Sequence, residues 1–271
     1  LPLTDYGRGL QEKRYTMSRT NCKNYCEWNP IARGIAEGKM RHYLNAAHQD
    51  KKIAIEMFHL DGAVAASFLE PIRLVELVLR EAIHRNMTNV YGSRWMYKGE
   101  LIDARSLEKV THSANRLGKN PPGDKIVSDL SLGFWAGLFQ KGGPASFDPS
   151  QRIRHSETLW NPALSSLFAD EKPERKYIAA LTLKISYLRN RMAHHEPILF
   201  GISQPGSTKN EKQIKQEPIN AYGDLIQLAT LLDVTLGDFL LENFAVIELL
   251  ESDLSLKALR HAKSHQNLYW I

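Results

Sequence analysis

The sequence has few of the features that mark secreted, membrane-spanning or β-sheet proteins. Its two cysteines, Cys22 and Cys26, are too few for a small secreted disulfide scaffold, and zinc would need two further ligands at a matching spacing. No apolar run approaches the ~20 residues that cross a bilayer, and the first thirty residues lack the apolar segment of a signal peptide. We therefore expect a cytoplasmic protein with free thiols, no metal, no cofactor and no membrane partner.

The composition permits a nucleic-acid partner without requiring one. The chain carries 35 Lys+Arg against 30 Asp+Glu, a net charge of +5. Such a mild basic excess suits a polyanionic partner, but many proteins without one are equally basic. The 271 residues are 43% hydrophobic and 24% charged, which is ordinary for a globular protein and enough for one large domain or two closely packed helical parts.

Helical periodicity covers most of the chain, and no sustained period-two alternation predicts a sheet. The expected class is all-α, with a polar arm over residues 1–35, a helical domain over 36–250 and a helical tail over 251–271. Asp50 is a plausible N-cap, and Pro71 precedes another helix. The expected helices lie at 38–48, 51 onward, 72–85, 102–117, 125–140 and 176–196, followed by two or three more.

The helix expected over 176–196 carries the run Y-L-R-N-R-M-A-H-H-E-P at 187–197. Its apolar residues recur every three or four positions, which predicts a buried stripe. Pro197 disfavours helical angles at the preceding residue, so the helix should end near Glu196. The members of the stripe are Ile178, Leu181, Ile185, Leu188 and Met192.

Arg189, Asn190 and His194 in this run suit phosphodiester cleavage. A guanidinium keeps its charge and can hold a phosphate, whereas an imidazole titrates near neutrality and can move a proton. At about 100° per residue, Asn190 and His194 form an i,i+4 pair facing away from the buried stripe, so Asn190 could hydrogen-bond His194. His195 would fall close to the stripe and is expected to be packed.

Three further residues are candidate supporting groups: Arg191, His195 and Glu76. Glu76 stands among apolar residues, where burying a carboxylate without a partner is costly. It could pair with Arg80, four residues on, or orient Arg189 from behind. The first of these two interpretations is the more ordinary.

Five segments stand out in order along the chain: K-M-R-H-Y-L (39–44), L-V-E-L-V-L-R-E-A-I (74–83), S-D-L-S-L-G-F-W-A-G-L-F (128–139), L-W (159–160) and L-R-N-R-M-A-H-H-E-P-I (188–198). Together they resemble the Abi-like (abortive-infection) proteins of bacteria, whose catalytic part belongs to the all-helical HEPN superfamily. The resemblance covers roughly residues 36–250 and departs from the family at two places. Leu60-Asp61 stands where the family usually has Trp-Asn, and Leu79-Arg80-Glu81 where it has Leu-Arg-Asn.

The resemblance implies a HEPN-like helical bundle with additional helices and a metal-independent endoribonuclease. Such enzymes dimerise so that two R-x-x-x-x-H motifs face one cleft, and they act as toxins or phage-defence effectors restrained by a protein or RNA antitoxin. RNA would be the substrate, with Arg189, Asn190 and His194 as catalytic residues.

Two alternatives remain. The chain could be a catalytically silent HEPN-type helical module that binds RNA or a partner protein. It could also be a metal hydrolase built on His194, His195 and Glu196, although H-H-E-P lacks the H-E-x-x-H spacing of known zinc enzymes.

Overall fold

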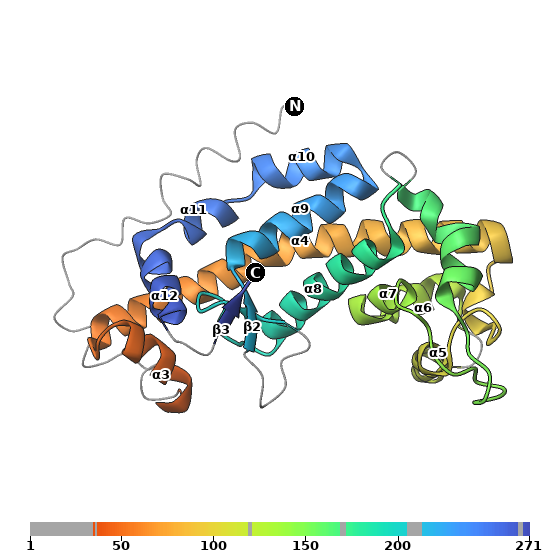
Figure 1. The fold of residues 1–271 in the computed structure, drawn as a ribbon, viewed down its shortest axis with the longest axis horizontal. Coiled ribbons are helices and arrows are strands. Elements are labelled where there is room, and N and C mark those ends of the chain that lie inside the picture. The colour runs from red at the N-terminus through yellow and green to blue at the C-terminus, as the bar shows by residue number, and fades with distance from the viewer. Residues whose placement is uncertain (1–34, 36, 119–120, 169–171, 205–212, 265–267) are drawn as a thin grey trace. The chain divides into compact units, whose positions relative to one another are not determined.

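The structure is a computed structural model that describes residues 35, 37–118, 121–168, 172–204, 213–264 and 268–271. Helices make up most of this part of the chain, so the predicted all-α class is confirmed (Figure 1). The helices are α3 (Glu37–Ala46), α4 (Lys51–Tyr91), η2 (Trp95–Tyr97), α5 (Ala104–Leu117), α6 (Gly123–Asp129), α7 (Leu132–Leu138), η3 (Ser156–Leu164), η4 (Ser165–Phe168), α8 (Arg175–Ala193), α9 (Pro218–Leu232), α10 (Val234–Asn243), α11 (Val246–Leu250) and α12 (Asp253–Lys263).

Two compact units divide the chain, residues 1–59 and 60–271, with the division inside α4. In the first unit, the Asp50 carboxylate accepts hydrogen bonds from the backbone N–H groups of Lys52 and Ile53, at 2.9 and 3.1 Å. The predicted N-cap is therefore confirmed. The two cysteines and residues 1–34 lie outside the described residues, and the division into arm, domain and tail stays a prediction.

Pro71 lies inside α4 rather than before a new helix, so the predicted break is wrong. A proline in a helix interior removes a hydrogen bond and costs about 3 kcal/mol. Apolar residues on both sides of it, including Phe68, Ile72 and Val75, are almost completely buried. Tertiary burial of this continuous face outweighs the local preference to stop.

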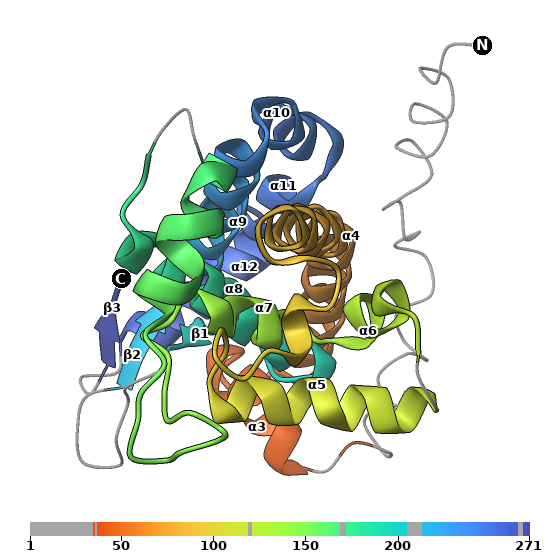
Figure 2. The ribbon, with the colours of Figure 1, turned by 90° about the vertical axis from the view of Figure 1, so that its right-hand side faces the viewer.

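In the second unit, α8 and α9 lie side by side, α10 packs on α9, and α7 packs on α8 (Figures 1 and 2). The Phe68 ring of α4 meets Tyr222 of α9 edge-on at 5.6 Å. The buried Tyr222 hydroxyl donates to the Leu240 carbonyl oxygen at 2.6 Å, and burial raises the pKa of Tyr222 to about 12. Tyr222 thus joins α4, α9 and α10 in one core.

A small sheet follows α8, which the sequence did not predict. β1 (Ile202–Ser203) pairs antiparallel with β2 (Gln213–Gln216), and β2 pairs parallel with β3 (Leu268–Trp270). Strands this short cannot display a period-two pattern. The expected helical tail therefore contains α12 and then a strand.

The helix expected over 125–140 is two short helices, α6 and α7, separated at Leu130 and Ser131. The backbone at both residues is extended. The Trp135 indole N–H donates to the Leu130 carbonyl oxygen at 3.3 Å, and the ring is fully buried. This aromatic segment therefore belongs to the core.

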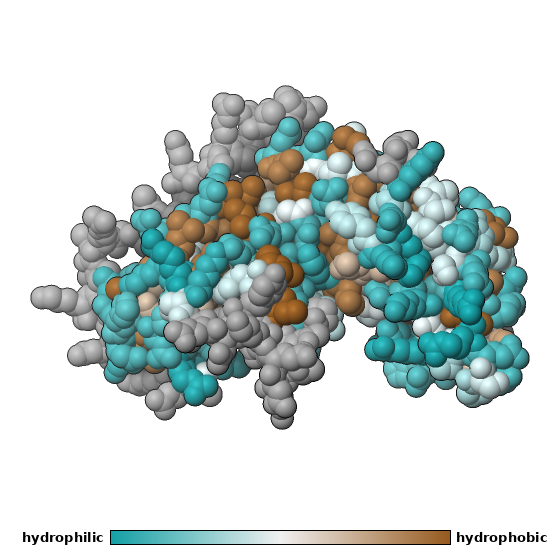
Figure 3. All heavy atoms as spheres, in the orientation of Figure 1, coloured by the Kyte–Doolittle hydropathy of each residue, from teal (hydrophilic) through white to brown (hydrophobic). Residues whose placement is uncertain are grey.

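Apolar side chains reach the surface over α10 and its neighbours (Figure 3); α10 exposes Val234, Phe239 and Leu241. This face lies on a different helix from the candidate catalytic residues. Among the described helices, none combines the length and apolar character needed to cross a membrane.

His155 makes stability sensitive to mild acid. Its side chain is fully buried, and its Nε2 lies 3.9 Å from the Asp103 carboxylate. Burial lowers the pKa of His155, an effect that Asp103 offsets only in part. The folded state therefore binds this proton less readily than the unfolded state, and stability falls as pH drops below the ordinary histidine pKa.

We expect the free energy of unfolding to fall as the pH drops from about 7 to about 5, through the ordinary pKa of histidine. Urea denaturation at several pH values in this range measures the free energy of unfolding. In the His155→Gln variant, this free energy should depend less on pH. Equal stability of the wild type at both ends of the range would contradict the assignment.

Candidate functional site

Helix α8 (Arg175–Ala193) carries the candidate residues, and its packing is as predicted. The apolar stripe faces the core, where α7 and α9 cover it. Its members are all buried: Ile178, Leu181, Ile185, Leu188 and Met192. The other side of the helix end, at Asn190 and His194, is exposed.

The C-terminus of α8 lies at Ala193, three residues before the predicted end. His195 adopts a left-handed conformation with φ 52°. Its N–H donates to the Met192 carbonyl oxygen at 3.0 Å, and the Glu196 N–H donates to that of Arg191 at 2.9 Å. This pair of bonds is the Schellman arrangement, which satisfies the last carbonyl groups of a helix. This turn, and not the effect of Pro197 on the residue before it, therefore ends the helix.

The three candidate catalytic residues lie together at this helix end. Asn190 and His194 are exposed, and Arg189 is half-buried. His194 is the C-cap residue; its φ of −95° and ψ of 7° stay near helical values, so it continues the row formed by Ser186 and Asn190 at spacings of four. Within the described chain, neither Arg189 nor His194 has an ion-pair partner.

The contact between Asn190 and His194 differs from the prediction. The His194 backbone N–H donates to the Asn190 backbone oxygen at 3.0 Å. Among the described residues, no side-chain hydrogen bond joins the two. The Asn190 amide is therefore available to a ligand, and the turn holds His194 through its backbone.

The prediction that His195 is packed is wrong, because its side chain is exposed. The angular argument assumed that the helix continued through residue 195, whereas the left-handed turn redirects that side chain. A left-handed conformation costs about 1–2 kcal/mol for a residue with a Cβ, and glycine avoids this cost.

We accordingly expect His195→Gly to raise the free energy of unfolding by about 0.5–1 kcal/mol, and His195→Val to lower it. Thermal denaturation of the two variants measures the difference. A glycine variant less stable than the valine variant would contradict the assignment of this turn.

Arg191 supports the turn rather than facing a ligand. Its Nη1 pairs with Glu196 Oε2 at 3.0 Å, and its Nη2 donates to the Pro197 carbonyl oxygen at 3.1 Å. Its side chain is 18% exposed. The guanidinium therefore closes the chain back onto α8 directly after the two histidines, and Glu196 is engaged by it.

Neither of the two contacts predicted for Glu76, with Arg80 or with Arg189, is present among the described residues. Glu76 is half-buried on α4, and within the described chain it forms no ion pair with Arg80 or Arg189. Arg80 Nε lies instead 3.7 Å from the carboxylate of its neighbour Glu81. Half-burial leaves the Glu76 carboxylate access to water, which removes the need for a partner.

Asp61 is the positioning residue that sequence reasoning missed. It is 7% exposed on α4, and its Oδ1 accepts the backbone N–H groups of Ile198 and Leu199, both at 2.8 Å. These residues follow the motif directly, so one buried oxygen fixes the chain after the turn. An asparagine oxygen could accept the same two bonds. The signal in the sequence was the Asp61 carboxylate itself, which stands in a largely apolar stretch of α4 and therefore needs hydrogen-bond donors.

The small sheet holds the same segment from the other side. Lys215 Nζ donates to the Phe200 carbonyl oxygen at 2.8 Å, and burial, with the nearby Arg191, lowers the pKa of Lys215. The Trp270 ring packs against Gly201 so closely that a Cβ there would lie 2.6 Å from it. The residues after the motif are therefore held from α4 and from β2 and β3.

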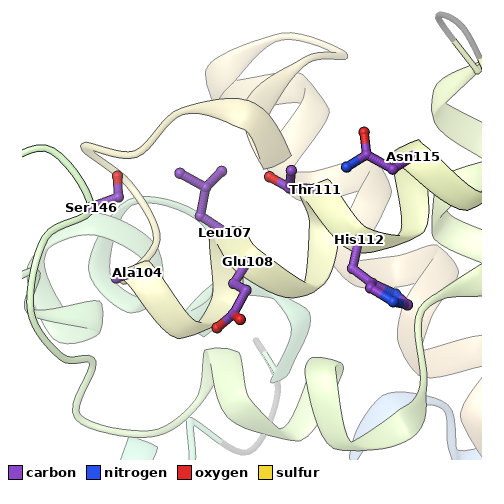
Figure 4. A pocket seen from close by; sticks show the side chains of 7 residues that line it. All are labelled: Ala104, Leu107, Glu108, Thr111, His112, Asn115 and Ser146. Carbon is purple, nitrogen blue, oxygen red and sulfur yellow. The ribbon is translucent and has the colours of Figure 1, made fainter.

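A hollow of about 410 Å³ lies on α5, away from this helix end. Its lining residues are Ala104, Leu107, Glu108, Thr111, His112, Asn115 and Ser146 (Figure 4). In Figure 4, Leu107, Thr111 and Asn115 point to one side of the helix and Glu108 and His112 to the other. The polar groups do not converge on one point, so the hollow offers no catalytic constellation.

The candidate site is thus the end of α8, with Arg189, Asn190 and His194 presented by a turn that Asp61 and Arg191 fix. Within the described chain, no three His, Cys, Asp or Glu side chains gather in a way that could hold a metal ion. The predicted lack of a metal or cofactor stays a prediction. Neither the known protein families nor the curated proteins nor the solved structures that were searched contain a match to this chain.

Proposed function

We propose that the chain is a metal-independent endoribonuclease of the HEPN type that cleaves RNA in the cytoplasm. The observation that carries the proposal is the helix end where an exposed His194, an exposed Asn190 and a half-buried Arg189 lie within six residues. Arg189 and His194 lack a carboxylate partner among the described residues. A site of this kind suits an anionic ligand.

The proposed reaction uses a nucleophile that RNA itself supplies. An imidazole accepts the proton of the 2′-hydroxyl, and that oxygen attacks the adjacent phosphorus. The bond to the 5′-oxygen breaks, and this oxygen takes a proton from a general acid. The products are a 2′,3′-cyclic phosphate and a 5′-hydroxyl. DNA lacks the attacking hydroxyl and is not a substrate.

Each candidate residue has one role in this scheme. His194 transfers the proton, and in the proposed homodimer its symmetry mate takes the complementary acid or base role. Arg189 stabilises the negative charge that builds on the phosphate oxygens. Asn190, whose amide faces solvent beside His194, positions the phosphate. Arg191 and Asp61 keep the helix end in place and touch no substrate.

The biological role follows from the resemblance. We propose a toxin or phage-defence effector that halts growth by cutting RNA, with a protein or RNA antitoxin as its restraint. The alternative is a catalytically silent HEPN-type module that binds RNA or a protein. A metal hydrolase built on His194, His195 and Glu196 is disfavoured, because Glu196 is held by Arg191.

Incubation of the purified protein with total RNA in excess EDTA tests the proposal. Cleavage that persists in EDTA and is lost in Arg189→Ala and in His194→Ala supports the nuclease. Cleavage abolished by EDTA would identify a metal enzyme. RNA binding without cleavage by the wild type would identify the silent module.

A further inference from the structure

Four basic residues form a stripe on α5: Arg105, Lys109, His112 and Arg116. They are spaced by four, three and four residues, which at about 100° per residue places them within a sector of roughly 60°. Ser106, Val110 and Ser113 of the same helix are buried. At the helical angle per residue, the stripe therefore runs along α5 beside the face that is buried.

The far end of the stripe is neutralised within the protein. Arg116 forms an ion pair with Asp129, the last residue of α6. Ser113 donates to the same carboxylate at 2.6 Å. The Arg116 hydrogen bond, and then that of Ser113, lower the pKa of Asp129, and the nearby His112 adds to this effect. Asp129 therefore serves Arg116 as a counter-charge.

Among the described residues, the near end of the stripe has no ion-pair partner, and the exposed Glu108 beside Lys109 in the sequence forms no ion pair there. Lys109 is half-buried, and its ammonium donates a hydrogen bond to the Gly133 carbonyl oxygen at 3.5 Å. Burial, and then the neighbouring Arg105, lower the pKa of Lys109. Within the described chain, neither Arg105 nor Lys109 has a carboxylate within ion-pair distance. Two adjacent cations, one half-buried, are costly unless an anion joins them.

Asp103, the acid that acts electrostatically on Lys109, is already engaged by other groups. Asp103 caps α5, because its Oδ1 accepts the Ser106 N–H at 2.8 Å. Its Oδ2 lies 3.9 Å from His155 Nε2, and the side chain is 13% exposed. Asp103 therefore moderates the charge on Lys109 without covering the ammonium, whose remaining donors stay available.

Gly133 connects this cation pair to the candidate site. The Gly133 carbonyl oxygen accepts a hydrogen bond from Lys109. A Cβ atom at Gly133 would lie 3.5 Å from Ser186 Oγ on α8. Ser186 begins the row that continues with Asn190 and ends at His194. Eight residues of helix span about 12 Å, so the buried Ser186 that Gly133 approaches lies about that far along α8 from His194. An RNA strand that extends from the cut past this turn of α8 would come close to Lys109.

We propose that Arg105 and Lys109 bind a backbone phosphate of the RNA strand that the α8 motif cleaves, several nucleotides away from the cut. This assignment rests on the proposed function. The contact is with phosphate, so it contributes affinity and register and does not read sequence.

The test measures binding of a fluorescent single-stranded RNA by anisotropy over a range of salt concentrations. All proteins carry His194→Ala, so that the RNA stays intact. The test variant is Arg105→Gln with Lys109→Met, because methionine keeps the aliphatic stem of the half-buried lysine. The matched control is Arg260→Gln with Lys176→Met, which removes two exposed charges from α12 and α8.

Each phosphate contact on a single strand contributes about 0.7 to the slope of log affinity against log salt. We expect the test variant, which loses the contact to one phosphate, to lose about 0.7 from this slope and to bind all sequences more weakly, while the control keeps the slope of the parent. Circular dichroism verifies that both variants are folded.

The outcomes separate this inference from the proposed function. An unchanged slope in a folded test variant, or an equal loss in the control, would overturn the phosphate site while leaving cleavage intact. The expected loss of slope, in a protein whose wild type never cleaves RNA, would overturn the proposed nuclease and leave the phosphate site standing. Absence of any RNA binding by the parent would overturn both.

Discussion

Replacing His194 with alanine should lower the rate of RNA cleavage by about 10²–10⁴-fold, the usual contribution of a general acid or base. Because His194 is an exposed C-cap residue held through its backbone, the variant should fold normally and still bind RNA. Arg189→Ala should cost about 10²–10³-fold, since it removes a charge that stabilises the transition state. Single-turnover cleavage of a labelled RNA measures both rates.

Two controls make this prediction specific to position. His195→Ala removes the adjacent exposed imidazole, and it should leave the cleavage rate within a few-fold of the wild type. Arg189→Lys keeps the charge but loses the two-pronged guanidinium, so it should recover only part of the rate. If His195→Ala is inactive while His194→Ala cleaves at nearly the wild-type rate, the assignment of the proton-transfer residue is wrong.

Replacing Asp61 with alanine should destabilise the protein by about 2–4 kcal/mol. The variant leaves two buried backbone N–H groups, those of Ile198 and Leu199, without their acceptor, and each such group costs about 1–3 kcal/mol. The segment that follows α8 would then no longer be held in place, so the rate of RNA cleavage should fall together with the stability of the protein. Urea denaturation measures the first effect, and cleavage by the remaining folded protein measures the second.

Asp61→Asn tests the reason for this loss. Both N–H groups bind one oxygen, Oδ1, so the asparagine carbonyl should retain most of the stability and activity. Asp238→Ala, at an exposed position of α10, should change stability by less than about 0.5 kcal/mol. An asparagine variant as unstable as the alanine variant would show that the carboxylate charge, and not the shared acceptor, matters.

Local patterns in the sequence predicted the helices better than their ends. The stripe on α8 recurs at helical spacing, and burial of that stripe is what holds the helix, so pattern and structure agree. The predicted helix break at Pro71 was wrong because burial of the apolar face of α4 outweighs the local effect of the proline. The predicted packing of His195 was wrong because this residue adopts a left-handed conformation that is usual for glycine. The three strands were not predicted, since each is too short to show alternation.

The composition of the candidate site could be predicted, but its support could not. Arg189, Asn190 and His194 lie within six residues, so one helix end necessarily brings them together. Asp61 is more than a hundred residues away in sequence, and its hydrogen bonds to Ile198 and Leu199 depend on the packing of α4. The proposed role of Arg105 and Lys109 depends on contacts with Gly133 and, through it, with Ser186. These residues are far apart in the sequence, so no local sequence pattern predicts that they lie close together.

The central claim is that the end of α8 cleaves RNA through the 2′-hydroxyl of the substrate. Mass analysis of the products from one RNA oligonucleotide, cut in EDTA, tests it most directly. We predict 2′,3′-cyclic phosphate and 5′-hydroxyl ends, and no cleavage when the nucleotide before the cut carries a 2′-deoxy sugar. Cleavage at the deoxy position, or products with a 5′-phosphate, would contradict the account.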